Sequence, residues 1–426
     1  MTPRSSTARI AADAESPDLS QSAEPKTASA TVVAAPSHAL TALIVVPTLH
    51  AGAADNGALD LVRILASAGH KPIVASCGGR LVDDVIAAGG ECVQIDMASR
   101  NPAVMLRNGW ALRRIVRERG CAVVHAHGRA PAWSAYFAAR MTGVPFLTTW
   151  HKGFREQNPF KRLYNGIMAR GDRVIAVSEQ IAQLIHDRYG TPWSRIAVVP
   201  ASVDFQRFDP AAVSRARIEA MRNAWGVGRS DRVILVVGRM LRRKGHHVVV
   251  DTVRRLKVMG AKDIVCIFAS VDQGTRYAAE LWDQVLATGT ADVIRMTGPM
   301  DDVPAGYAAA SVVVSAAVQP EGMQRGLIEA QAMARPVIVS ELGAGPDVVL
   351  APPAVPHDQM TGMRFPTGDS SALAAALMRL FSMPPATQHA IGARGRAWVL
   401  GHFTAPAAAE LTLKLYAEVA ARRINA

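Results

Sequence analysis

The stretch SVVVSAAVQPEGMQRGLIEAQAMARPVIVS, from Ser311 to Ser340, contains the unit from which the fold can be worked out. Its first eight residues form an apolar, β-branched run that is typical of a buried strand, and a second such run follows at 335–340. Between them lie a glycine-containing turn and a helical pattern. A strand, a helix and a second strand in this order are typical of a parallel sheet.

The same alternation of short strands and longer helical segments extends through most of the chain. Further strand-like runs lie at 41–47, 71–76, 121–127, 144–150, 172–178, 196–204, 232–238, 263–270 and 292–298. We therefore expect an α/β fold with two doubly wound, Rossmann-like domains. The predicted boundaries are 39–200 for the first domain, 201–404 for the second and 405–426 for a final helix.

Residues 1–38 differ in composition from the rest of the chain. They are rich in Ala, Ser, Thr and Pro, carry several acids and lack an apolar core segment. This composition predicts a disordered leader and argues against a secretory signal.

Cysteine usage and hydropathy exclude several classes of protein. Half of the 426 residues are apolar, and the four cysteines stand far apart without a C-x-x-C pair. A disulfide framework and a structural zinc site are therefore not expected, and a reducing compartment fits best. No uninterrupted apolar run reaches the roughly 18 to 20 residues that cross a bilayer.

The formal net charge of +12 is concentrated in the first half, where residues 39–200 hold 19 Lys and Arg against 11 Asp and Glu. Such a surplus suits nucleic acid, an anionic membrane surface or phosphate-bearing substrates, although a basic cluster is also typical of a solvated face. No nucleic-acid-binding motif accompanies the charge, so nucleic acid is not an expected partner.

Functional residues are expected in the loops after the strands, because ligands of doubly wound sheets bind at the carboxyl ends of the strands. The loop GRMLRRKG contains Gly238 at the strand end, the cations Arg239 and Lys244, and Gly245 at the start of a helix. Two cations beside a helix N-terminus predict a phosphate site. The alternative is a basic helix start, and the loop matches neither the P-loop nor the G-x-G-x-x-G pattern.

Two acids distinguish the loop after 311–318. Glu321 lies in the turn, and Glu329 follows eight residues later among apolar neighbours. An acid in such a setting usually has a fixed partner, because an unpaired buried charge is costly. Carboxylates also accept paired hydrogen bonds from sugar hydroxyls. The alternative for Glu329 is an acid favoured by the helix dipole.

Together these motifs resemble those of the GT-B glycosyltransferases of family 4, also known as glycosyl transferase group 1. The resemblance runs from about Leu43 to the final helix. Its most specific parts are E-x7-E from Glu321 to Glu329, followed by AQAMARPVI, and G-R-x4-K-G at 238–245. It implies a cleft between an acceptor-side first domain and a nucleotide-sugar-binding second domain, with the final helix crossing back to the first.

The resemblance also implies roles for individual residues. Glu329 would bind the ribose of a nucleotide diphosphate sugar, and no further cofactor is expected. The candidate catalytic residues are His151, which falls where the family places a histidine near the reacting sugar carbon, and Glu321. The residues expected to bind the diphosphate are Gly52, Gly238, Arg239 and Lys244, and those expected to bind the sugar are Gly322, Met323, Gln324, Arg325 and Gly326.

Three positions depart from the family pattern. The first loop carries Ala53 where many relatives have a second glycine, Ala201 and Ser202 replace Arg-Gly, and Met323 and Gln324 replace Phe-Gly. The pair His125 and His127 has the spacing of two metal ligands, but no third ligand accompanies it, which favours a core or cleft role. No D-x-D occurs in the chain, and no metal is expected.

The sequence thus predicts a retaining glycosyltransferase that moves a sugar from a nucleotide diphosphate to a saccharide or lipid-linked saccharide. Resemblance alone suggests a role in building a bacterial envelope polysaccharide, in the cytoplasm or at the inner face of its membrane. Two alternatives remain: a nucleotide-sugar epimerase of the same fold, and a catalytically weak nucleotide-sugar-binding protein at a membrane surface.

Overall fold

The first half of the chain forms a seven-stranded parallel sheet. The computed structural model describes residues 39–50, 52–154, 158–269 and 274–424, so the predicted leader lies outside the described residues. The strand order is β3-β2-β1-β4-β5-β6-β7. The strands are β1 (Thr41–Val45), β2 (Lys71–Ser76), β3 (Glu91–Gln94), β4 (Val123–Ala126), β5 (Phe146–Trp150), β6 (Arg173–Ala176) and β7 (Ile196–Val198).

The second half forms a six-stranded parallel sheet in the order β10-β9-β8-β11-β12-β13. Its strands are β8 (Arg232–Val237), β9 (Ile264–Ala269), β10 (Ile294–Thr297), β11 (Val312–Ser315), β12 (Val337–Ser340) and β13 (Met363–Phe365). Both sheets lie in one compact unit of the chain. The expected α/β fold with two doubly wound, Rossmann-like sheets is confirmed.

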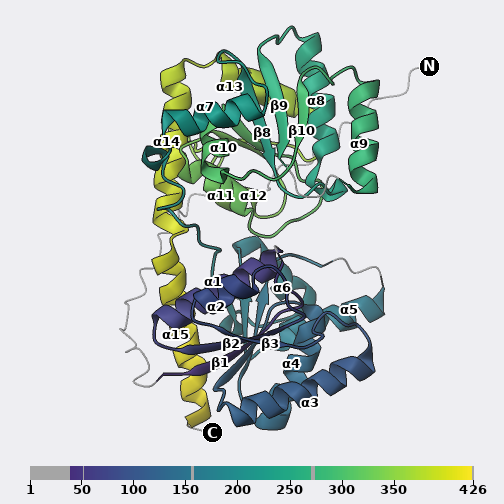
Figure 1. Cartoon of the computed structure of the whole chain (residues 1–426), viewed down its shortest axis with the longest axis vertical. Coiled ribbons are helices and arrows are strands. Elements are labelled where there is room, and N and C mark those ends of the chain that lie inside the picture. The colour runs from purple at the N-terminus through teal and green to yellow at the C-terminus, as the bar shows by residue number, and fades with distance from the viewer. Residues whose placement is uncertain (1–38, 51, 155–157, 270–273, 425–426) are drawn as a thin grey trace, which may run out of the picture. The chain divides into compact units, whose positions relative to one another are not determined.

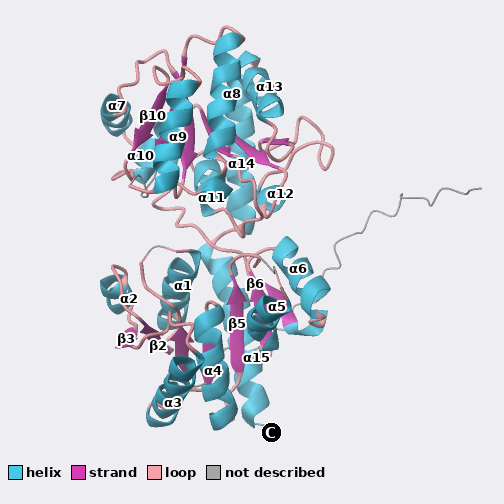
Figure 2. Cartoon of the chain, turned by 90° about the vertical axis from the view of Figure 1, so that its right-hand side faces the viewer, coloured by secondary structure: helices cyan, strands magenta, loops and turns pink. Residues whose placement is uncertain are grey.

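Helices cover both faces of each sheet (Figures 1 and 2). Those of the first half are α1 (Ala53–Ser67), α2 (Val82–Ala87), α3 (Pro102–Glu118), α4 (Arg129–Thr142), α5 (Pro159–Gly166) and α6 (Glu179–Tyr189). The second half contains α7 (Arg215–Ala224), α8 (His246–Val258), α9 (Arg276–Ala287), α10 (Val303–Ala309), α11 (Arg325–Ala332), α12 (Gly345–Val348), α13 (Ser370–Ser382), α14 (Pro385–His402) and α15 (Ala405–Ile424). Short 3₁₀ turns lie at η1 (Ile167–Arg170), η2 (Trp193–Arg195), η3 (Pro210–Ala212) and η4 (Arg242–Lys244).

Each strand of the sheet centre buries both of its faces. In β1, Leu43 packs in a cluster that includes α3, α4 and α6, whereas Ile44 packs in another that includes α1 and α15. In β8, Leu235 and Val236 separate in the same way between two further clusters. Successive side chains of a strand point to opposite faces, which explains why these strands are apolar throughout rather than alternating.

Two strands were not predicted, and one prediction was too long. The unpredicted strands, β3 and β13, pair at the edges of their sheets and have four and three residues. The residues of β3 are half-buried or exposed, so the strand lacks the apolar run that marks a central strand. The strand expected at 196–204 ends at Val198.

Helix α15 contributes to the core of the first sheet. The buried side chains of Leu415, Tyr416 and Val419 pack in the cluster that contains β1 and α1. The hydroxyl of Tyr416 also forms a 2.8 Å hydrogen bond with Nδ1 of His125 on β4. The end of the chain is therefore attached to the same sheet as its beginning.

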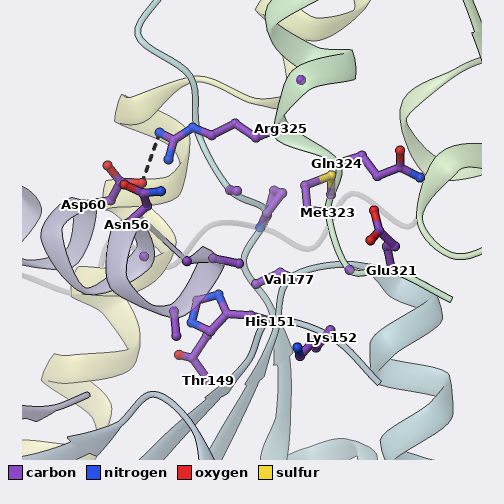
Figure 3. Close-up of a pocket in the computed structure, with 18 of the residues that line it drawn as sticks. Asn56, Asp60, Thr149, His151, Lys152, Val177, Glu321, Met323, Gln324 and Arg325 are labelled. Carbon is purple, nitrogen blue, oxygen red and sulfur yellow. Dashed lines mark ion pairs between the residues drawn. The ribbon is translucent and has the colours of Figure 1, made fainter. Parts of the chain in front are cut away.

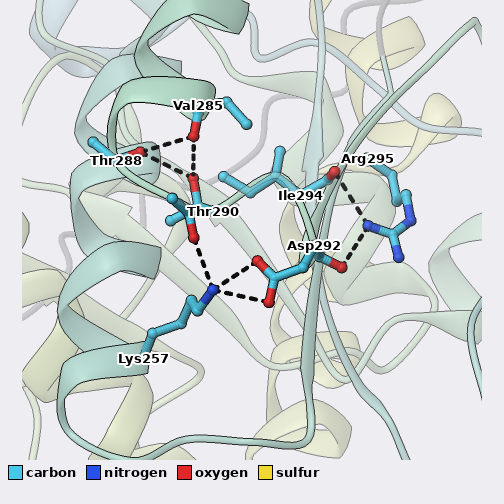
Figure 4. A network of polar contacts seen from close by, with 8 residues as sticks. Lys257, Val285, Thr288, Thr290, Asp292, Ile294 and Arg295 are labelled. Atoms are coloured by element: carbon cyan, nitrogen blue, oxygen red, sulfur yellow. Dashed lines mark hydrogen bonds and ion pairs between the residues drawn. The ribbon is translucent and has the colours of Figure 1, made fainter.

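A polar network anchors the edge strand of the second sheet (Figure 4). Lys257 in the last turn of α8 donates to the carbonyl of Gly289, at 2.8 Å, and to the carboxylate of Asp292, at 2.6 Å. Thr288 and Thr290 bond to each other at 3.0 Å. Since Asp292 is 63% exposed, the ion pair contributes at most about 1 kcal/mol. The pairing of β10 with β9 remains the main attachment of this edge.

Candidate active site

The loops that leave the central strands of both sheets line a pocket of about 570 Å³. In each sheet the strand order reverses beside the first strand, between β1 and β4 and between β8 and β11. The residues predicted for the site all line this pocket (Figure 3): Gly52, His151, Gly238, Arg239, Lys244, Glu321, Gly322, Met323, Gln324, Arg325, Gly326 and Glu329. Their assignment to parts of a donor molecule stays a prediction.

Glu321 joins the two loops of the second sheet. Its carboxylate, 6% exposed, accepts hydrogen bonds from Arg243 and Lys244 and forms an ion pair with each. Arg242 points elsewhere, because its guanidinium pairs with Glu280 at 2.6 Å. The three basic residues form the 3₁₀ turn η4, in which successive side chains point in different directions. The turn therefore directs two of its three cations toward Glu321.

Gly245 allows the basic loop to pack against the end of β11. Its φ of 73° is in the left-handed region, and a Cβ there would lie 1.7 Å from the carbonyl oxygen of Ala316. The amide of Val318 donates to the carbonyl of Arg243 at 2.9 Å in the same contact. Only glycine fits this position, and the G-R-x4-K-G motif ends with it for that reason.

Gly322 brings the turn that carries Glu321 against the loop that carries His151. A Cβ at Gly322 would lie 1.7 Å from the carbonyl oxygen of His151. On the other side of His151, a Cβ at Gly57 in α1 would lie 2.4 Å from its Cε1. Two glycines therefore create the space that His151 occupies, and the sequence motifs marked only Gly322.

Three histidines of the first sheet lie together without charge. His127 Nδ1 and His151 Nε2 share a hydrogen bond of 2.9 Å. His125 bonds through Nε2 to Thr149 at 2.7 Å and through Nδ1 to Tyr416. Burial lowers the pKa of His125 to about 3 and that of His151 to about 4, and places the pKa of His127 well below its usual value. His151 Nδ1 has no protein partner among the described residues, so it is left for a ligand.

The metal-pair alternative for His125 and His127 finds no support in this arrangement. The described residues contain no group of three His, Cys, Asp or Glu side chains that could hold a metal ion. Both ring nitrogens of His125 already have protein partners. Its place between Thr149 and Tyr416 is that of a core residue.

Glu329 has a partner, as expected for a buried acid. Its carboxylate accepts a 2.9 Å hydrogen bond from the hydroxyl of Tyr307, and Arg325 lies 3.8 Å away. Burial raises the pKa of this carboxyl group, while Arg325 acts in the opposite direction. Arg325 also pairs with Asp60 of α1 at 3.2 Å and donates to the carbonyl of Ser202 at 3.0 Å. It thus connects the E-x7-E helix to the first half of the chain.

Gln324 presents an amide group that lacks a complete set of partners. It precedes α11 and is 7% exposed. Its Oε1 accepts from the hydroxyl of Ser315, whereas its Nε2 is buried and has no partner among the described residues. A buried amide donor without an acceptor is costly, and its position in the pocket wall leaves it available to a ligand.

The first loop closes on an acid instead of a second glycine. The carboxylate of Asp55 accepts from the amides of Gly52, at 2.9 Å, and His50, at 3.1 Å. Gly52 is the N-cap of α1 and keeps its place in the pocket wall. The departure at Ala53 therefore leaves the loop ordered by hydrogen bonds from within it.

Sequence reasoning missed three charged residues of the pocket, namely Arg243, Lys152 and Asp60. Asp60 stands alone on the apolar face of α1, the same signal that marked Glu329, and could have been found by it. Arg243 could have been found by treating the basic loop as a single turn. With these residues the described pocket wall carries five Lys and Arg against three Asp and Glu. Burial, and next to it Arg243, lowers the pKa of Lys152, so an anion would be stabilised here.

The histidine cluster predicts a loss of stability in mild acid. Histidines of the unfolded chain titrate near pH 6.5, whereas His125, His127 and His151 titrate lower when folded. Below pH 6.5 the unfolded state therefore binds more protons, and the unfolding free energy falls as the pH drops toward 4. The slope is at most about 1.4 kcal/mol per pH unit for each histidine.

Urea unfolding at pH 7.5, 6.5 and 5.5 measures this slope. The His127→Leu variant removes one titrating group and should show a shallower dependence on pH, whatever its stability at pH 7.5. An unfolding free energy that is equal at pH 7.5 and 5.5 in the unsubstituted protein would contradict the buried, neutral cluster.

Comparison with known proteins identifies the family. A model described as Glycosyltransferase Family 4 matches residues 54–207, and one described as Glycosyl transferases group 1 matches residues 231–383. Each sheet of the structure contributes most of its strands to one of the two matches.

Curated relatives include D-inositol 3-phosphate glycosyltransferases. That of Salinispora arenicola is 27% identical over 280 residues, which cover 61% of this chain and only 60% of the relative. That of Kineococcus radiotolerans is 29% identical over 324 residues, which cover 70% of this chain and 72% of the relative.

Solved structures give the same result for the fold. A glycosyltransferase from Rickettsia africae superposes with a TM-score of 0.80 at 26% identity, covering 90% of this chain and 99% of that one. HepE from Anabaena, in complex with UDP and glucose, has a TM-score of 0.74 at 17% identity, covering 88% of this chain and 99% of that one. Given the two matched family models, the paired Rossmann-like sheets and the pocket between their strand ends, the chain belongs to the GT-B glycosyltransferases of family 4, a family of transferase enzymes.

Proposed function

We propose that this chain is a metal-independent, retaining glycosyltransferase that uses a nucleotide diphosphate sugar. One observation carries the proposal: a single pocket collects the cations of the GRMLRRKG loop together with both acids of E-x7-E. Arg239, Lys244 and the N-terminus of α8 suit the two phosphates, and Glu329 suits the ribose hydroxyls. HepE of Anabaena, whose structures contain UDP and UDP-glucose, supports a nucleotide sugar as donor.

In the proposed reaction, departure of the nucleotide diphosphate is the step that needs electrostatic stabilisation. Lys244 and Arg239 would stabilise the charge that develops on the leaving phosphate, with Gly52 and Gly238 giving close approach to the backbone. The acceptor would attack from the face that the phosphate leaves. Because burial keeps the imidazole of His151 neutral at pH 7, it would hydrogen-bond the sugar through Nδ1 without adding positive charge.

Glu321 and the residues that follow it would hold the sugar. Glu321 is paired with Arg243 and Lys244, so it also fixes the cations that face the phosphate. The amides of Met323, Arg325 and Gly326 at the start of α11, and the side chain of Gln324, would supply the polar contacts.

We further propose that the acceptor is a saccharide or a lipid-linked saccharide, used in the assembly of a bacterial envelope polysaccharide. The basic first half would approach the anionic inner face of the cytoplasmic membrane, where a lipid-linked acceptor resides. The excess of positive charge in residues 39–200 supports this placement. No described helix combines the length and the apolar character that a membrane span requires.

Incubation with a panel of nucleotide sugars, in EDTA and with or without saccharide acceptors, tests the proposal. Transfer that needs both substrates and persists in EDTA is the expected outcome. Conversion of a nucleotide sugar without any acceptor would indicate the epimerase alternative. A donor that raises the melting temperature but is never consumed would indicate the weak nucleotide-sugar-binding protein. Transfer that EDTA abolishes and magnesium restores would contradict the cation-based mechanism.

The basic turn predicts unequal effects of neighbouring substitutions. Lys244→Ala should lower kcat/KM by about 100-fold or more, because this charge acts on the leaving group in the transition state. Arg242→Ala is the matched control and should have far less effect, since Arg242 pairs with Glu280 outside the pocket. Steady-state kinetics of both variants decide the point. Equal losses would mean that the turn acts only as a general basic surface.

The unpartnered amide of Gln324 predicts a role in sugar selection. Gln324→Gly should accept a wider range of nucleotide sugars, and its transition state for the preferred donor should be destabilised by roughly 1 to 3 kcal/mol. The reason is that Nε2 would bond a particular sugar hydroxyl, since Oε1 is already occupied by Ser315. Competition between donors measures the selectivity. An unchanged profile with full activity would remove Gln324 from the sugar site.

A further inference from the structure

A second hollow, separate from the pocket described above, lies on the surface of the first half. Its volume is about 620 Å³. Three arginines line it: Arg162 from α5, Arg170 from η1 and Arg195 from η2. Tyr136 and Tyr189 contribute aromatic walls. None of the described residues that line it is acidic, so the hollow carries an uncompensated positive charge.

The contacts of these arginines leave their charges unneutralised. Arg162 donates to the carbonyl of Arg188 at 2.7 Å, and Arg195 donates to that of Gly171 at 3.5 Å. The guanidinium of Arg170 lies over the ring of Tyr136, 6.0 Å from its centroid. Within the described part of the chain, none of the three forms an ion pair with a carboxylate. Guanidinium groups bind phosphate oxygens in paired hydrogen bonds, so a phosphate group would supply the missing charge.

The helix that provides Arg162 also presents apolar side chains to solvent. Phe160 is 83% exposed, the largest fraction for any large apolar side chain among the described residues, and Leu163 is 60% exposed. The two stand three residues apart on α5 and therefore share one face. Lys161, between them, is exposed as well. Apolar residues beside cations on a short surface helix are the pattern of segments that enter a membrane interface.

We propose that this surface, made of Phe160, Leu163, Arg162, Arg170 and Arg195, docks on an anionic phospholipid bilayer. The arginines would bind phosphodiester groups of the lipid headgroups, and Phe160 and Leu163 would enter the boundary between headgroups and acyl chains. The inference rests on the membrane placement in the proposed function and assigns that placement to particular residues. Charge complementarity favours an anionic bilayer over a protein partner, because the hollow and its rim carry cations and aromatic groups without a single acid.

The position of the docking surface connects it to the acceptor side of the active site. α5 begins at Pro159, eight residues after His151, and Figure 2 shows it beside β5, the strand that leads into His151. A lipid-linked acceptor that is held in the same bilayer would therefore lie near the loop that carries His151. Docking would place the enzyme where its acceptor is concentrated.

Cosedimentation of the full chain with vesicles tests the proposal. We expect binding to vesicles of phosphatidylglycerol and phosphatidylcholine, weakening as salt is added, and little binding to phosphatidylcholine alone. Arg170→Glu should lower the partition coefficient by about fivefold or more, and the Phe160→Ser, Leu163→Ser double variant by about tenfold. Both variants should keep the turnover of nucleotide sugar with a soluble acceptor, because neither touches the active-site pocket.

Matched variants separate this site from general effects. Arg117→Glu on α3 changes net charge equally, and the Val258→Ser, Leu286→Ser double variant removes exposed apolar side chains of the second half. Either control lowering vesicle binding as much as its test variant would overturn the proposal, as would equal binding to both kinds of vesicle. A melting temperature raised by inorganic phosphate, lost in Arg170→Glu and unaccompanied by vesicle binding, would identify a free-phosphate site instead. Vesicle binding without sugar transfer would overturn the proposed function and leave the docking surface standing.

Discussion

The carboxylate of Glu321 is the contact on which the geometry of the active-site pocket depends. It joins the loop after β11 to Arg243 and Lys244 in the loop after β8. Its neighbour Gly322 has no side chain and lies against the carbonyl of His151. One short turn thus aligns the two cations and brings the histidine of the first sheet beside them. The surrounding strands supply rigidity, because both of their faces are buried.

The two sides of the pocket differ in how they treat charge. On the side of the first sheet, burial keeps three histidines neutral, and hydrogen bonds with each other, Thr149 and Tyr416 satisfy most of their polar atoms. On the side of the second sheet, cations are kept charged and held by acids. Neutral groups near the reacting sugar and fixed charges near the leaving phosphate are an arrangement suited to a reaction in which negative charge moves toward the phosphate.

Much of the fold follows from the sequence, because central strands of parallel sheets are apolar throughout and stand out as uninterrupted runs. The edge strands β3 and β13 are short, and β3 is partly exposed, which removes that signal. The predicted site residues come together because they directly follow strands. Contacts between distant segments leave no local pattern, which is why Asp60 opposite Arg325, and Gly57 against His151, needed the structure.

The pairing of Glu321 with Arg243 and Lys244 has a consequence for the strength of donor binding. In the free protein these cations are already neutralised by an internal counter-charge, so an incoming phosphate exchanges with a carboxylate instead of filling a bare cationic site. The measured affinity then reflects the difference between two sets of ion pairs, and each is much stronger than that difference. A moderate affinity for the nucleotide diphosphate follows, which favours its release after each turnover. The same internal acid keeps an empty pocket from retaining unrelated anions.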